Sequence, residues 1–143
     1  MTHLYPLELD RFLSPRLWGG DRLGSFLTLS ERTGDEPLGE AWSIYSGNRI
    51  LNGPLQGKTL DEASAELGAA LVGTVAAGRY GDRFPLLAKF IDAGDEVSIQ
   101  VHPDDRYARE HEAASGFLGK SEAWLILDAE PDAERRHAKA QAL

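Results

Sequence analysis

The chain contains no cysteine among its 143 residues. Disulfide bonds are therefore excluded, and so are metal sites built from thiolates. A metal ion bound here would need histidine, glutamine, aspartate or glutamate as ligands. Their nitrogen and oxygen atoms suit zinc and other divalent first-row metals.

Positive charge is also scarce, because 15 lysines and arginines stand against 23 acidic residues and the net charge is −8. A nucleic-acid backbone requires a broad basic surface, so we expect no nucleic-acid partner. The sequence lacks an apolar run of about 18 residues, and Met1 to Asp10 does not resemble a signal peptide. We therefore expect a cytoplasmic protein without a membrane partner.

The chain has the length and the ordinary composition of one soluble globular domain. Its apolar stretches are short and are separated by glycine, proline and asparagine, which is typical of a mainly β protein. We expect a cupin-like jelly-roll barrel or sandwich with two or three short helices. The expected domain covers residues 1–130, and residues 131–143 are expected to form a polar helical or disordered tail. The expected strands are 4–9, 39–45, 49–51, 84–93, 98–102 and 123–127, with loops at 14–20, 31–38 and 78–83.

Three segments have the features of helices. Thr59 and Glu62 form a capping box before apolar residues at helical spacing, and this predicts a helix over 60–72 that ends at Gly73. Asp21 is expected to cap a short helix over 22–27. Asp104 or Asp105 is expected to cap another over 106–114.

The most informative stretch is the expected strand at 98–102, which is followed about twenty residues later by Gly119-Lys120-Ser121-Glu122. Alternate side chains of a strand share one face, so Ser98, Gln100 and His102 would project together while apolar neighbours pack on the other side. Gln100, His102 and Glu122 would offer a divalent metal three nitrogen or oxygen ligands. Two simpler interpretations stay open: His102 hydrogen-bonded in a polar pocket, and Glu122 exposed.

Lys89 is the exception in the apolar segment 84–93, since lysine is rarely buried without a partner. Either its ammonium group reaches out of the strand end, or it lines the same pocket as Gln100 and His102.

Several ordered motifs together resemble the N-terminal half of type I mannose-6-phosphate isomerases, and in particular the short bacterial branch of that cupin family. The resemblance extends from about Tyr5 to Asp128. Its motifs are Leu17–Gly20, Gly39–Ile44, Asn52-Gly53 with Gly57–Leu60, Phe84–Lys89, Ser98–Asp105 and Gly119–Leu127.

The resemblance implies a zinc-dependent aldose–ketose isomerase that interconverts mannose 6-phosphate and fructose 6-phosphate. It places Gln100, His102 and Glu122 at zinc-ligand positions and Lys120 at a position for substrate contact or proton transfer. Glu40 and Glu122 remain rival candidates for the base. The other matching positions are at the pocket wall or its border: Ser98 and Lys89, which would contact the substrate, and Trp18, which either contacts it or anchors its loop.

The chain also departs from the family. Longer members have His-Lys where this chain has Gly119-Lys120, and they continue into a second half that supplies a further histidine ligand, an arginine and much of the phosphate site. His137 is a poor substitute, because it lies in the tail where the resemblance has ended. We therefore expect a truncated relative, whose uncovered sheet edges favour association between copies. The alternatives are a non-catalytic metal-binding cupin module that binds a sugar phosphate or a partner chain, and a structural fragment whose metal site is empty.

Overall fold

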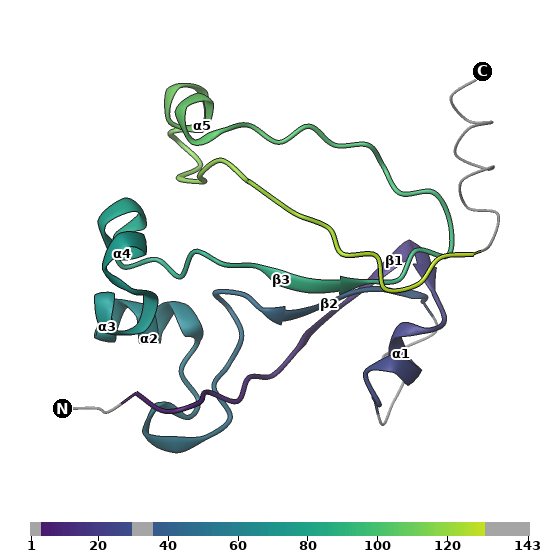
Figure 1. The fold of residues 1–143 in the computed structure, drawn as a ribbon, viewed down its shortest axis with the longest axis horizontal. Coiled ribbons are helices and arrows are strands. Elements are labelled where there is room, and N and C mark those ends of the chain that lie inside the picture. Colours follow the sequence, from purple (N-terminus) through teal and green to yellow (C-terminus); the bar gives the residue numbers. More distant parts are fainter. Residues whose placement is uncertain (1–3, 30–35, 131–143) are drawn as a thin grey trace. The chain divides into compact units, whose positions relative to one another are not determined.

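The computed structural model describes residues 4–29 and 36–130 (Figure 1). The chain divides into two compact units, Met1–Ser98 and Ile99–Leu143. Most of the expected loop at 31–38, the expected tail at 131–143 and His137 lie outside the described residues. No helix in the described ranges is long and apolar enough to cross a membrane.

The first unit contains an open three-stranded antiparallel sheet in the order β1-β2-β3. The strands are β1 (Phe12–Gly20), β2 (Leu38–Ile44) and β3 (Ala88–Ile91). The sequence predicted β2 correctly from its alternating apolar residues. The predicted loop at 14–20 is wrong, because β1 continues through it with register shifts on both sides of Pro15, which has no N–H to donate to a ladder.

The predicted strand over 84–93 is shorter than expected, and burial on both faces is wrong. Only the four residues of β3 belong to the ladder, and none of them is fully buried. Leu86 and Leu87, just before β3, are exposed. Across the described ranges the sheet remains open, so a small antiparallel sheet with several helices is observed, without the expected mainly β jelly-roll barrel.

The helices of the first unit are α1 (Leu23–Phe26), α2 (Leu60–Leu67), α3 (Ala69–Val72) and α4 (Thr74–Tyr80), with a 3-10 turn at Gly53–Leu55. The capping box of Thr59 and Glu62 is confirmed at the start of α2. The single helix predicted over 60–72 is instead divided at Gly68, whose φ of 51° is a left-handed value that favours glycine. Helix α4 was not predicted, and its last residues were instead expected to belong to the loop at 78–83.

The core of this unit lies beside α2. Ile50, Leu55, Leu60 and Ala63 are buried together. The segments 4–9 and 49–51 were expected as strands, but they contribute only isolated bridges, at Leu9 with Ile50 and at Arg49 with Thr59. Ile50 belongs to this core, and Tyr5, Leu7 and Leu9 pack against it instead of forming a second ladder.

The second unit contains α5 (Asp105–His111), and the Asp104 carboxylate caps it by accepting from the Tyr107 amide at 2.7 Å. The strands expected at 98–102 and 123–127 are wrong, since neither segment belongs to a ladder in the part of the chain that the structure describes. Their apolar side chains are not packed on a sheet, and Ile99 and Val101 are 96% and 94% exposed. Alternation along a segment produces a strand only where a partner strand is available.

The cap of α1 comes from a distant residue. Asp21 was expected in that role, but the Asp92 carboxylate accepts from the backbone amides of Arg22 and Leu23 at 2.7 and 3.0 Å. The Gly20 amide also donates to the Asp92 carbonyl at 2.9 Å, which joins the end of β1 to the residue after β3. Asp92 therefore fixes the entry of α1 onto the sheet.

Replacing Asp92 by alanine should lower the free energy of unfolding by about 1–2 kcal/mol, because two amides at the start of α1 lose their acceptor. Chemical denaturation measures this change. Asp21→Ala is the matched control and should change stability by less than about 0.5 kcal/mol. A larger loss of stability in Asp21→Ala than in Asp92→Ala would show that Asp21 is the cap.

Candidate metal centre

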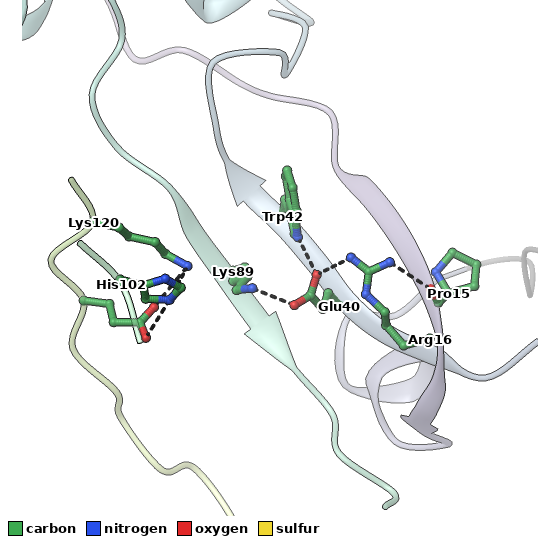
Figure 2. Close-up of polar contacts among 8 residues, drawn as sticks. Pro15, Arg16, Glu40, Trp42, Lys89, His102 and Lys120 are labelled. Carbon is green, nitrogen blue, oxygen red and sulfur yellow. Dashed lines mark hydrogen bonds and ion pairs between the residues drawn. The ribbon is translucent and has the colours of Figure 1, made fainter. Parts of the chain in front are cut away.

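Three of the predicted site residues meet in the second unit (Figure 2). The His102 Nε2 atom lies 3.4 Å from Oε1 of Glu122. The Lys120 Nζ atom lies 3.2 Å from Oε2 of Glu122 and 3.3 Å from Nε2 of His102. An imidazole, a carboxylate and an ammonium group thus form a triangle of mutual contacts.

The backbone brings these residues together. The Lys120 amide donates to the Pro103 carbonyl at 3.0 Å, which places the segment after Gly119 against the segment that carries His102. A Cβ atom built on Gly119 would overlap the backbone of Asp104 and Asp105. Glycine at this position therefore permits the close approach.

The cluster is partly open to solvent. The exposed fractions of the side chains are 23% for His102, 39% for Lys120 and 37% for Glu122. A hydrogen bond from Lys120 lowers the pKa of the Glu122 carboxyl, and this effect together with the Lys120 charge outweighs the opposing cost of desolvation. Glu122 is thus held as a carboxylate, the form that ligates a metal.

Gln100, the third predicted ligand, lies two residues before His102 in the same extended segment, and it is exposed. Within residues 4–29 and 36–130, no three histidine, cysteine, aspartate or glutamate side chains form a group that could hold a metal. A site at His102 and Glu122 therefore depends on a neutral ligand such as the Gln100 amide oxygen. This donor set suits an open, three-ligand zinc site.

A second polar cluster lies on the sheet of the first unit and centres on Glu40, which is 5% exposed. Lys89 Nζ lies 2.6 Å from Oε1 of Glu40, while Oε2 accepts from Arg16 at 3.1 Å and from the Trp42 indole at 3.0 Å (Figure 2). Lys89 stands opposite Trp42 in the β2–β3 register, and its ammonium group lies 5.9 Å from the Trp42 ring centroid. The sequence left two positions open for the Lys89 ammonium group, and neither of them included Glu40 as its partner.

Glu40 is ionised in this environment. Burial raises its pKa, but the hydrogen bonds from Lys89 and Trp42 and the charges of Lys89 and Arg16 outweigh that effect and lower the pKa below its ordinary value of 4.5. Arg16 was not predicted as a site residue. Its position two residues before Trp18 gave no signal, because Arg16 and Glu40 are 24 residues apart in the sequence and belong to different strands, β1 and β2.

Trp18 and Ser98, the remaining residues predicted to contact the substrate, lie outside the two polar clusters. Trp18 lies in β1, where its carbonyl accepts from the amides of Gly94 and Asp95 at 2.9 and 3.2 Å. A Cβ built on Gly39 would come within 2.9 Å of the Trp18 ring, so this ring packs closely on β2. Ser98 is exposed at the end of the first unit. The packing of Trp18 is consistent with an anchor for its segment.

The sequence and structure were compared with known proteins. Residues 7–137 match the family described as phosphomannose isomerase type I, catalytic domain. The chain is 40% identical over 141 residues to a probable mannose-6-phosphate isomerase, GmuF, of Bacillus subtilis, and 42% identical over 135 residues to the mannose-6-phosphate isomerase ManA of the same organism. These alignments cover 94% and 90% of this chain, but 40% and 39% of the relatives.

The folds agree as well. The crystal structure of the mannose 6-phosphate isomerase from Bacillus subtilis matches 87% of this chain with a TM-score of 0.69 and 40% identity, over 38% of its own length. The enzyme from Salmonella typhimurium, solved with substrate (F6P) and zinc, matches 74% of this chain with a TM-score of 0.54 and 27% identity, over 29% of its own length.

This chain therefore spans about two fifths of the length of the curated relatives it matches. The match nevertheless includes all the motifs between Leu17 and Leu127 on which the resemblance was based. The chain belongs to the type I phosphomannose isomerase family.

Proposed function

We propose that the chain acts as a zinc-dependent aldose–ketose isomerase that interconverts mannose 6-phosphate and fructose 6-phosphate. The observation that carries this proposal is the meeting of His102, Lys120 and Glu122 in the second unit. A relative at 27% identity was solved with F6P and zinc, which supports the choice of substrate and metal.

Gln100, His102 and Glu122 would hold the zinc ion and leave further coordination positions open. Zinc supplies Lewis-acid polarisation of the sugar oxygens and orients the substrate. The ionised state of Glu122 and the imidazole of His102 suit this role.

Isomerisation moves a proton between two adjacent carbons of the sugar, so a positioned side chain must accept the proton and return it. We assign this role to Lys120, whose Nζ lies against Glu122 and His102 and whose side chain is 39% exposed. A lysine can accept a proton only as the neutral amine, a form that a nearby metal cation favours. Ser98 and Lys89 are assigned to substrate contact, where a hydroxyl and an ammonium group would bind phosphate or sugar hydroxyls. For Trp18 both predicted roles stay open, substrate contact and an anchor for its segment.

Glu40 is better suited to position Lys89 than to act as the base. Both of its carboxylate oxygens accept hydrogen bonds, from Lys89 on one side and from Arg16 and Trp42 on the other. A carboxylate with three donors and a lowered pKa has little tendency to take a proton from carbon. We therefore propose that Glu40 fixes the Lys89 ammonium group.

A second candidate function is a metal-binding module without catalysis, which binds a sugar phosphate or a partner chain. The observation that favours it is the ion pair of Lys120 with Glu122, because an ammonium group held in this way has no lone pair with which to accept a proton. The two functions share the metal ligands and differ in turnover.

Turnover distinguishes them. We expect the purified chain loaded with zinc to form fructose 6-phosphate from mannose 6-phosphate, followed by a coupled assay. A chelator or His102→Ala should abolish the reaction, because each removes the metal. His111→Ala, on the exposed surface of α5, is the matched control and should keep the rate. Bound zinc with no turnover would favour the non-catalytic module.

Glu40→Gln should reduce the free energy of unfolding near neutral pH by about 2 kcal/mol, because the charged hydrogen bonds to Lys89 and Arg16 are weakened. The pKa of Glu40 is depressed in the fold, so its contribution is present above the unfolded value near 4.5 and is lost as pH falls below it. The difference between wild type and Glu40→Gln should therefore shrink on acidification. Denaturation across pH, with exposed Glu96→Gln as the control, measures this; a difference independent of pH would refute it.

Gly119→Ala should weaken zinc binding roughly tenfold, because the added Cβ would push the 119–122 segment away from Asp104 and so separate Glu122 from His102. Titration with zinc measures the affinity. Gly24→Ala, where an added Cβ meets nothing, controls for a general effect of the substitution. Unchanged affinity in Gly119→Ala would mean that the close approach is not required.

A further inference from the structure

The Lys120 ammonium group lies against the same atoms that are proposed to bind the metal. Its Nζ is 3.3 Å from Nε2 of His102 and 3.2 Å from Oε2 of Glu122. An ammonium group has three N–H donors and no acceptor, so it can contact both ligands at once, as a cation does. The Lys120 ammonium group thus lies beside the imidazole and the carboxylate that would also stabilise a metal cation.

In either neutral tautomer the Nε2 atom of His102 is engaged by a neighbouring side chain. With the proton on Nδ1, Nε2 has a single lone pair, and that lone pair accepts from Lys120. With the proton on Nε2, the nitrogen donates toward Oε1 of Glu122 at 3.4 Å and has no lone pair for a metal. Ligation through Nε2 therefore requires the present contacts of His102 to be broken.

We propose that Lys120 is a built-in competitor for the metal ion, which occupies His102 and Glu122 before metal binding and is displaced when the metal binds. This inference rests on the proposed metal site and adds a second role for Lys120. Metal binding at His102 and Glu122 and the release of the Lys120 side chain are then a single event. The residue assigned to proton transfer is freed to face the substrate only once the metal is in place.

The competition should be moderate rather than strong. The side chains of Lys120 and Glu122 are 39% and 37% exposed, so a displaced ammonium group is readily hydrated. Partly exposed ion pairs are weak and are screened by salt. The backbone bond from Lys120 to Pro103 does not involve the side chain, so the lysine can move without unfolding the segment.

The test is the affinity for Zn²⁺ alone, measured near neutral pH by competition with a chromogenic chelator. Lys120→Met and Lys120→Gln should bind zinc about threefold to tenfold more tightly than wild type, because the competing ammonium group is gone. Arg106→Met removes the same charge from an exposed position on α5 and should change the affinity less than about twofold. Circular dichroism of each variant verifies that the fold is retained.

A second measurement follows the lysine itself. Zinc should increase the rate at which an amine-reactive reagent labels Lys120 in the wild-type chain, read by mass spectrometry, while Lys58, paired with Glu66 in the first unit, serves as the internal reference. Equal or weaker zinc binding by both Lys120 variants, or unchanged labelling of Lys120, would overturn the competition and leave the metal site standing. Absence of zinc binding in wild type and variants alike would overturn the metal site as well.

Discussion

A single backbone hydrogen bond, from the Lys120 amide to the Pro103 carbonyl, is the constraint on which the candidate site depends. It aligns the segment carrying Lys120 and Glu122 with the segment carrying His102. Gly119 allows this alignment, since any side chain there would meet the backbone of Asp104. Asp104 in turn caps α5, so the helix and the candidate ligands share one anchoring point.

The two polar clusters illustrate how surroundings decide the role of a carboxylate. Glu40 is buried and has three charged or polar donors, which favours a fixed ion pair that orders other side chains. Glu122 is partly exposed, and its main partners are one flexible ammonium group and one imidazole. Partners of that kind can be exchanged for a metal ion, whereas those of Glu40 are held by the sheet.

Local chemistry was predictable from the sequence, and long-range pairing was not. The capping box at Thr59, a cap of α5 by Asp104 or Asp105 and a strand at β2 were predicted from neighbouring residues, and each is present. The alternating burial expected along β2 is wrong, since Ile44 is exposed and Glu40 is buried. The cap of α1 by Asp92 joins residues about seventy positions apart, which no local pattern encodes. The strand at 98–102 was inferred from alternation and the strand at 123–127 from an apolar run, but a ladder also requires a partner segment.

The same distinction applies to the site. The proximity of His102 and Glu122 was expected from the family resemblance, whereas the contact between Arg16 and Glu40 joins two different strands, β1 and β2. The most direct test of the central claim is a crystal structure of the zinc-loaded chain, with the metal located by anomalous scattering. We expect zinc about 2.0–2.2 Å from a ring nitrogen of His102 and from oxygens of Gln100 and Glu122, with Lys120 turned away. Zinc bound elsewhere, or Lys120 still between His102 and Glu122, would contradict it.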